Sequence, residues 1–126
     1  MKPRVIKTIT LLASLLFVTA SHAMNLAGQW SGNLEVGQQA VPIIFNVSNS
    51  DNSYTATMDS PMQGATGIPV ESVEINGDSI IFSIKVAGAR YEANVKDGKM
   101  IGTWKQSGQA FALNMQKGTT ETVKKN

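Results

Sequence analysis

The side chains that most often carry out chemistry in proteins are scarce in this sequence of 126 residues. No cysteine occurs, and the single histidine, His22, lies in an N-terminal segment that we expect to be removed. A Ser-His-Asp triad needs an imidazole to accept the proton of the nucleophile, and zinc sites are built mainly from histidine and cysteine. The sequence therefore predicts no histidine or cysteine catalysis, no metal site and no cofactor.

A serine nucleophile paired with a lysine base stays formally possible. Ser60 is the candidate, with Lys85 or Lys105 as its base. A serine beside a proline is, however, typical of a turn in which the hydroxyl bonds nearby backbone. We expect that structural role for Ser60.

Paired carboxylates are the other catalytic arrangement that the residue types allow. Asp59, Glu71 and Glu74 lie near one another in the sequence and could support glycoside hydrolysis. Acidic residues on the solvent side of strands are the commoner explanation, since carboxylates are mostly exposed. The sequence thus favours a protein that is not an enzyme.

Binding of a small hydrophobic or amphipathic ligand has better support from residue types. Aromatic side chains that point into a β-barrel either fill it or stack on a ligand, and a packed core is the commoner outcome. Amides can add polar contacts to such a site or can satisfy the backbone of a loop. The candidate ligand-binding residues are Trp30, Trp104, Tyr54, Tyr91, Gln63 and Gln106.

One segment, residues 58–70, is rich in turn-forming residues and lacks a clear strand pattern. We expect it to be an irregular connection, longer than a hairpin needs, and such loops often carry function. It is predicted to bridge two strands and to cover one end of the fold. Its candidate site residues are Asp59, Ser60, Pro61, Gly64, Gly67 and Pro69.

The rest of the chain after residue 24 shows the period of half-buried strands, with an apolar residue at every second position. Pro42 must lie at an edge, a bulge or a strand start, because it cannot donate to a sheet ladder. The Asn76-Gly77 and Asp97-Gly98 pairs are typical of tight hairpins. The runs are 26–36, 41–47, 54–58, 70–75, 79–86, 91–95, 100–106 and 111–115.

About eight short strands with tight turns predict an all-β fold, a small antiparallel up-and-down β-barrel of lipocalin-like character. A sandwich is the alternative, but closure of the sheet removes exposed edges. Glycines within the strand patterns, at Gly28, Gly32 and Gly102, fit the sharp coiling of a small barrel.

The N-terminus has the pattern of a secretory signal peptide. Basic residues precede an apolar run at residues 9–18, and small residues precede the expected cleavage after Ala23. The run is shorter than a spanning helix needs, so we expect no stable membrane anchor. The predicted organisation is a signal peptide at 1–23, a barrel at 24–116 and a polar tail at 117–126, in a periplasmic or secreted protein.

Removal of the signal changes the charge of the protein. Of the 11 Lys and Arg, three lie within residues 1–23, so the remaining 103 residues carry eight basic and nine acidic side chains. A near-neutral domain lacks the basic excess that nucleic acids and anionic membranes attract. We therefore expect no nucleic-acid partner.

Three segments of the chain have distinctive patterns of glycine, proline and aromatic residues. They are Gly28-x-Trp30-x-Gly32-x-Leu34, Asp59-Ser60-Pro61-x-Gln63-Gly64-Ala65-x-Gly67-Ile68-Pro69-Val70 and Ile101-Gly102-Thr103-Trp104-x-Gln106-x-Gly108-x-x-Phe111-x-Leu113. Together they resemble the small β-domain that precedes the catalytic domain of some exported bacterial α/β-hydrolases and also occurs alone. The sequence departs from the pattern of that domain at Met62, where an acidic residue is common, and at Ala112, where proline is common.

The resemblance spans nearly all of the chain after the signal. It implies a barrel without catalysis of its own, because the hydrolase chemistry belongs to a domain that this sequence does not contain. The first functional hypothesis is an exported module that binds a small ligand at the barrel mouth. The second is an envelope accessory protein that associates with a hydrolase or another protein, and a carboxylate hydrolase is third.

Overall fold

The structure, a computed structural model, describes residues 25–118. It contains nine strands and two short 3-10 helices. In chain order these are β1 (Gly28–Val36), β2 (Gln39–Ser50), β3 (Ser53–Ser60), η1 (Pro61–Gln63), β4 (Ala65–Val70), β5 (Ser72–Asn76), β6 (Ser79–Ile84), η2 (Lys85–Ala87), β7 (Ala89–Lys96), β8 (Lys99–Gln106) and β9 (Gln109–Lys117).

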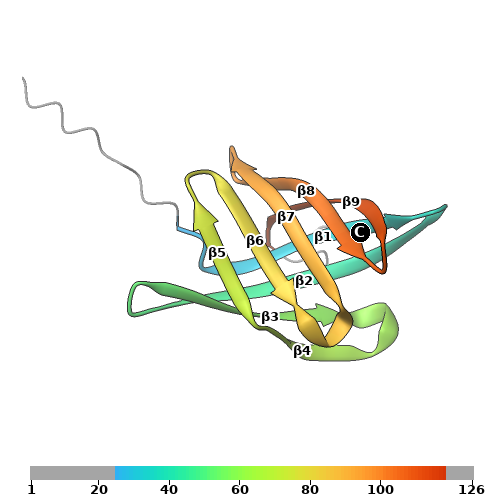
Figure 1. Cartoon of the computed structure of the whole chain (residues 1–126), viewed down its shortest axis with the longest axis horizontal. Coiled ribbons are helices and arrows are strands. Elements are labelled where there is room, and N and C mark those ends of the chain that lie inside the picture. Colours follow the sequence, from blue (N-terminus) through green and yellow to red (C-terminus); the bar gives the residue numbers. More distant parts are fainter. Residues whose placement is uncertain (1–24, 119–126) are drawn as a thin grey trace, which may run out of the picture.

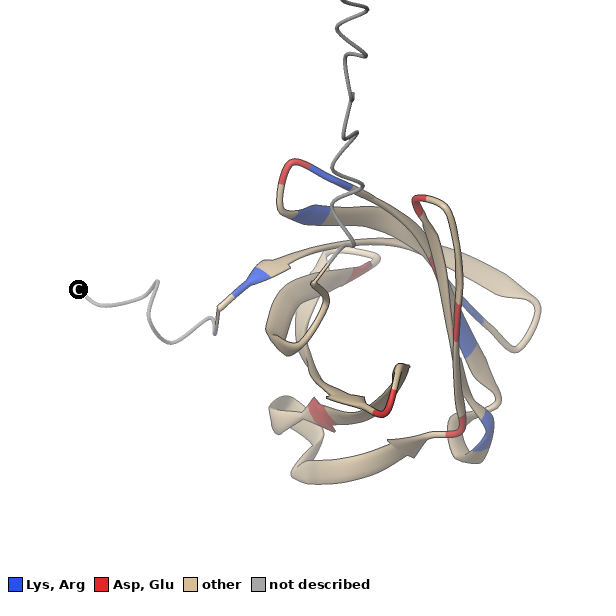
Figure 2. Cartoon of the chain, turned by 90° about the vertical axis from the view of Figure 1, so that its left-hand side faces the viewer, with Lys and Arg blue, Asp and Glu red and all other residues tan. Residues whose placement is uncertain are grey.

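All nine strands form one antiparallel sheet in the order β4-β3-β2-β1-β9-β8-β7-β6-β5. Each strand pairs with its neighbour in sequence, except that β1 also pairs with β9 and that β4 and β5 do not pair. The sheet curls into a nearly closed up-and-down barrel (Figures 1 and 2). The predicted all-β barrel is confirmed, with nine strands in place of about eight.

The additional strand comes from the segment that the sequence predicted to be an irregular loop. That prediction is wrong, because β3 continues to Ser60 and β4 begins at Ala65. One turn of 3-10 helix joins them, and Gly64, with φ of 68°, reverses the chain. Ile68 and Val70 pair with residues of β3 in the sheet ladder, so residues 65–70 are strand in spite of Pro69.

The connection between β6 and β7 repeats this arrangement. The sequence predicted a strand through Val86, but β6 ends at Ile84 and η2 follows. Gly88 closes η2 in the left-handed region, with φ of 61°, as Gly64 closes η1. Both turns lie at the same end of the barrel (Figure 1).

Alternating side chains fill the barrel, as the period of the sequence predicted. Phe45, Phe82 and Tyr91 meet at its centre, with ring centroids 4.5 to 6.2 Å apart. All three are fully buried, and aliphatic side chains and methionines pack around them. The interior of the barrel is therefore a packed core.

Gly32 and Gly102 lie where neighbouring backbones come too close for any side chain. A Cβ atom on Gly32 would collide with the backbone carbonyl of Asn114 on β9, and one on Gly102 with that of Glu92 on β7. Both glycines thus let adjacent strands approach and coil, as expected for a small barrel.

Pro42 occupies an edge-like position although β2 is a central strand. It pairs with Asn33 of β1, whereas the ladder between β2 and β3 begins at Ile44. The missing N–H of Pro42 consequently interrupts no hydrogen bond to β3.

The predicted signal peptide and most of the predicted tail lie outside the described residues. Lys117, which we expected to begin the tail, is the last residue of β9. None of the helices among residues 25–118 has the length and apolar character that crossing a membrane requires.

Candidate functional site

Three of the four aromatic candidates lie inside the barrel. Trp30, Trp104 and Tyr91 are buried, and Tyr54 is half-buried. The Tyr91 hydroxyl donates to the backbone carbonyl of Leu113 at 2.6 Å. Burial raises the pKa of this phenol well above its ordinary value, so the hydroxyl stays protonated as a donor.

Trp30 and Tyr54 are joined through the backbone of Leu26. The Trp30 indole donates to the Leu26 carbonyl at 2.9 Å, and the Leu26 N–H donates to the Tyr54 hydroxyl at 3.3 Å. Leu26 is itself buried in the core. These two aromatic side chains hold the start of the described chain against the barrel.

Each of the two glutamine candidates has a local partner. The hydroxyl of Ser60, which is buried, donates to Oε1 of Gln63 at 2.9 Å. Gln106 accepts from the Trp104 indole at 3.0 Å and donates to the carbonyl of Ala87 at 2.8 Å. The amides therefore stabilise the turns η1 and η2, and their role in ligand binding stays a prediction.

Asp59 ties the two ends of the η1 hairpin together. Its Oδ1 accepts from the N–H of Gly67 at 2.8 Å, and its Oδ2 accepts from the amide of Asn46 at 3.1 Å. Asn46 in turn accepts from Gln29 at 3.0 Å. A polar ladder thus crosses β1, β2, β3 and β4 on the outside of the barrel.

The catalytic alternatives gain no support from these contacts. Ser60 is bonded to Gln63, and Asp59 is bonded to the β2 and β4 partners named above. Glu71 accepts from the backbone N–H of Lys85 at 2.7 Å, and Glu74 is exposed on β5. Within residues 25–118 no group of three or more His, Cys, Asp or Glu side chains could hold a metal ion.

A further carboxylate, Glu92, lies on β7 between two basic side chains. Glu92 accepts a hydrogen bond from Lys105 at 3.1 Å and forms an ion pair with Arg90 at 2.8 Å. The hydrogen bond from Lys105, followed by the two positive charges, lowers the pKa of Glu92. This cluster is exposed to solvent and gives no sign of acid-base chemistry.

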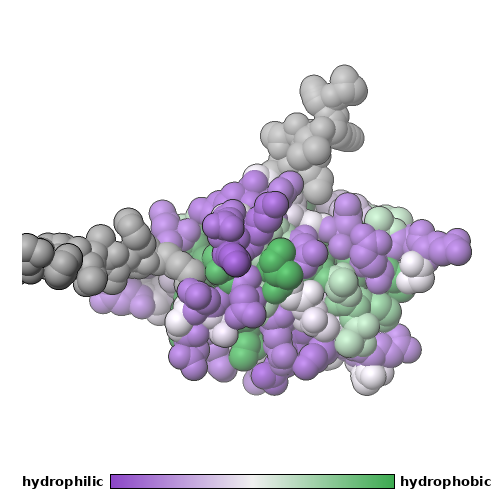
Figure 3. All heavy atoms as spheres, turned by 90° about the horizontal axis from the view of Figure 1, so that it is seen from above, coloured by the Kyte–Doolittle hydropathy of each residue, from purple (hydrophilic) through white to green (hydrophobic). Residues whose placement is uncertain are grey.

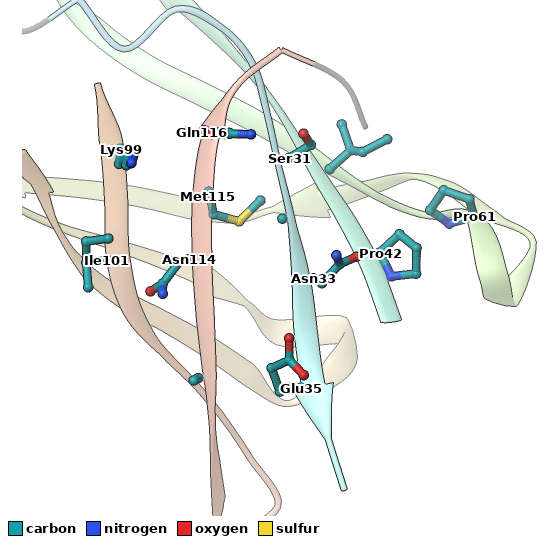
Figure 4. Close-up of a pocket in the computed structure, with 13 residues that line it drawn as sticks. Ser31, Asn33, Glu35, Pro42, Pro61, Lys99, Ile101, Asn114, Met115 and Gln116 are labelled. Atoms are coloured by element: carbon teal, nitrogen blue, oxygen red, sulfur yellow. The ribbon is translucent and has the colours of Figure 1, made fainter. Parts of the chain in front are cut away.

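A groove of about 840 Å³ lies on the outer side of β8, β9, β1 and β2 (Figure 4). Its polar groups are mainly neutral amides and a hydroxyl, with one carboxylate, Glu35, and one ammonium, Lys99. Apolar side chains alternate with them. The lining residues include Asn33, Asn114, Pro42, Ile101 and Pro61.

Strand pairing explains how distant residues meet in this groove. Asn33 and Asn114 are direct partners in the ladder between β1 and β9. The close approach at Gly32 brings these two strands together beneath them. Sequence reasoning missed the groove, because its residues are ordinary outward positions of strands whose pairing no local pattern reveals.

The groove continues to the η1 end of the barrel. Pro61, the first residue of η1, lines the groove, and the next residue, Met62, is 52% exposed. Val86, the corresponding residue of η2, is 67% exposed. The space-filling view shows apolar patches among mostly hydrophilic side chains (Figure 3). The groove together with Met62 is called the outer surface below.

Comparison of the chain with protein-family models, with curated proteins and with solved structures finds no match.

Proposed function

We propose that this protein is a non-enzymatic binding module whose partner is another protein, docked on the outer surface. The observation that carries the proposal is the packed interior, in which Phe45, Phe82 and Tyr91 occupy the centre of the barrel. A ligand inside the barrel would have to displace these rings, so a partner is expected to bind the outer side of the sheet.

The chemistry of the outer surface suits a protein partner. Met62 and Ile101 are large apolar side chains that are about half exposed, and methionine is enriched at protein interfaces. The amide of Asn33 can donate and accept, and Nδ2 of Asn114 can donate, while Oδ1 of Asn114 already accepts from the N–H of Gly102 at 3.2 Å. Ile101 and the amides lie along one hollow, and Met62 directly follows Pro61, which lines it, so a single docked segment could contact all of them.

We further propose that the protein acts in the periplasm or outside the cell. The basic and apolar pattern of residues 1–23 supports export. The resemblance to the domain that accompanies exported hydrolases supports an enzyme of that class as the partner. In this arrangement the module would hold or orient a hydrolase without taking part in its chemistry.

A small amphipathic ligand is the second candidate, and the volume of the groove is the observation that favours it. About 840 Å³ falls within the range of small-molecule sites. Such a ligand would rest on Ile101 and Pro42 and bond the amides of Asn33 and Asn114. This places the ligand on the outside of the barrel and not among the buried tryptophans.

Photo-crosslinking in the producing cells tests the first candidate. A photoreactive phenylalanine that replaces Asn33 or Met62 should crosslink to the partner protein. The crosslinked products from the two positions should have the same mass. The matched control, the same residue at Arg90 on the outside of β7, should give none. Ile101→Lys should abolish the Met62 adduct without lowering Tm, because Ile101 is already half exposed.

The result distinguishes the two candidates. Adducts of equal yield at Arg90, or an Ile101→Lys variant that crosslinks normally, would rule out docking on the outer surface. Native mass spectrometry of the protein purified from those cells completes the test. A co-purified small molecule, lost in Ile101→Lys, would establish the second candidate instead.

A further inference from the structure

The seam of the barrel leaves two strand edges, on β4 and β5, that pair with no other strand among residues 25–118. Such edges present free backbone N–H and C=O groups to any chain that can pair with them. On β4, Pro69 has no N–H to offer and Gly67 is in the left-handed region, with φ of 65°. β5 contains neither proline nor lysine, two residues that commonly prevent an edge strand from pairing with another chain. β5 is therefore the edge that is open to pairing.

The hairpin geometry shows which groups of β5 are free. β5 and β6 are joined by the two-residue turn Gly77-Asp78, and the pair that closes such a turn is normally hydrogen-bonded. Bonded and non-bonded pairs alternate along an antiparallel ladder. The backbone groups of Val73 and Ile75 consequently point away from β6, toward the seam.

The side chains of the same two residues belong to the core side of the sheet. Val73 lies opposite Phe82 and Ile75 opposite Ile80, and both partners are fully buried. Ile75 is nevertheless 39% exposed. β3 comes near β5 across the seam, but no strand pairs with β5 on that side, so a strand added along β5 would cover Ile75.

Taken together, the strands at the seam, β3, β4 and β5, carry acidic side chains and no basic ones. No Lys or Arg occurs between Asn25 and Ile84, a stretch that includes β1 to β6. Figure 2 shows the acidic positions in red and the basic positions in blue. The acidic residues of that stretch are Glu35, Asp51, Asp59, Glu71, Glu74 and Asp78.

The basic side chains of the described chain all follow β6, and they do not neutralise β5. Both ion pairs among residues 25–118 use Glu92, on β7. Glu74 lies opposite Ile81 on the outer side of β5, is exposed and makes no hydrogen bond or ion pair within this part of the chain. Its carboxylate is thus available to a cation on an adjacent strand.

We propose that the edge of β5 binds an extended basic segment of a partner polypeptide, which adds to the sheet as an antiparallel strand. Alternate side chains of the segment would be apolar, covering Ile75 and Val73, and basic, facing Glu74. A second copy of β5 is a poor occupant, because antiparallel pairing centred on Glu74 sets two carboxylates opposite each other. This surface lies apart from the outer surface, so the inference goes beyond the proposed function.

A fluorescent peptide tests the inference on protein purified from cells that express the full chain. The probe is an acetylated and amidated heptapeptide that alternates valine and lysine, and fluorescence anisotropy gives its Kd. Glu74→Lys should weaken binding by about tenfold or more, because an attraction becomes a repulsion. The matched control Asp51→Lys, at an exposed acid in the turn between β2 and β3, should leave the Kd unchanged.

Two further measurements separate strand addition from charge attraction alone. A probe that is N-methylated at alternate residues keeps its charges but cannot pair with an edge, and it should bind about tenfold more weakly or not at all. Amide exchange of Val73 and Ile75 should slow on binding of the normal probe, and exchange in β4 should not.

Several outcomes would overturn the inference. Equal affinity for the normal and N-methylated probes would leave only charge attraction, and equal effects of Glu74→Lys and Asp51→Lys would remove β5 from the site. If the probe does not bind at millimolar concentration, the inference is also wrong. A dimer of the protein that Glu74→Lys strengthens would identify a second copy as the occupant.

Discussion

The indole of Trp104 donates to Oε1 of Gln106 at 3.0 Å, and the same amide donates from Nε2 to the carbonyl of Ala87 at 2.8 Å. One side chain thus satisfies a buried indole of β8 and a carbonyl of η2. Gln106, which the sequence suggested as a ligand-binding residue, therefore stabilises the turn η2.

Replacement of Gln106 by alanine should therefore destabilise the fold. It leaves the Trp104 N–H and the Ala87 carbonyl without their partners, and the expected loss is about 1 to 3 kcal/mol in the free energy of unfolding. Urea denaturation followed by tryptophan fluorescence measures it. Gln109→Ala, at an exposed position in the next strand, is the control and should change stability by less than about 0.5 kcal/mol. Equal stability of the two variants would contradict the structural role.

Tyr91→Phe should change both the stability and its dependence on alkaline pH. The loss of the hydrogen bond to Leu113 should lower the free energy of unfolding by about 1 kcal/mol at pH 7. Because burial raises the pKa of Tyr91 in the folded state, its contribution is complete below about pH 10, the ordinary tyrosine pKa, and is lost as pH rises toward the folded value.

Denaturation at a series of alkaline pH values checks this sign. The wild type should lose stability above about pH 10, and Tyr91→Phe should lose less over the same range. Tyr54→Phe keeps the buried phenol of Tyr91 and should retain the full alkaline loss. Parallel curves for the wild type and Tyr91→Phe would show that Tyr91 does not control this transition.

Gly32→Ala should be among the most damaging small substitutions in the chain. Its Cβ would meet the backbone of Asn114, and a backbone cannot yield as a flexible side chain does. We expect a loss of about 4 kcal/mol or more, which a small domain tolerates poorly. Gly64→Ala is the control: its Cβ meets open space, and the left-handed φ of 68° costs only about 1 to 2 kcal/mol. If Gly32→Ala and Gly64→Ala have the same Tm, β1 and β9 do not approach each other as closely at Gly32 as the structure shows.

Lys117→Met should loosen the start of β1. The ammonium of Lys117 donates to the carbonyl of Ala27 at 2.7 Å and lies 5.4 Å from the ring centroid of Trp30. Loss of both contacts should lower stability by about 1 kcal/mol. Lys96→Met, at an exposed lysine, should have little effect, and Lys117→Arg should restore part of the loss. Thermal melts of the three variants provide the comparison.

The barrel could be predicted from the sequence because its two controlling signals are local. Apolar residues at every second position placed Phe45, Phe82 and Tyr91 on the inner side of their strands, where the structure has them. The Asp97-Gly98 pair located a tight turn between β7 and β8. Neither signal depends on which strands finally pair.

Residues 65–70 could not be assigned in the same way. Gly67 and Pro69 are typical of loops, and here they lie in an edge strand, where half of the backbone groups need no partner. The candidate site was harder still. Asn33 and Asn114 meet only because β1 pairs with β9, a contact between residues 81 positions apart in the sequence. No pattern within either strand reports that pairing.

The pairing of β1 with β9 also has a consequence for how the chain folds. Every other ladder joins strands that are neighbours in sequence, so the meanders β1–β4 and β5–β9 can each grow from local hairpins. Joining them through β1 and β9 requires the closure of a loop that contains nearly the whole domain, which is entropically the most costly contact of the fold. We expect this closure to limit the folding rate. The contact between β1 and β9 at Gly32 should then be among the last to form.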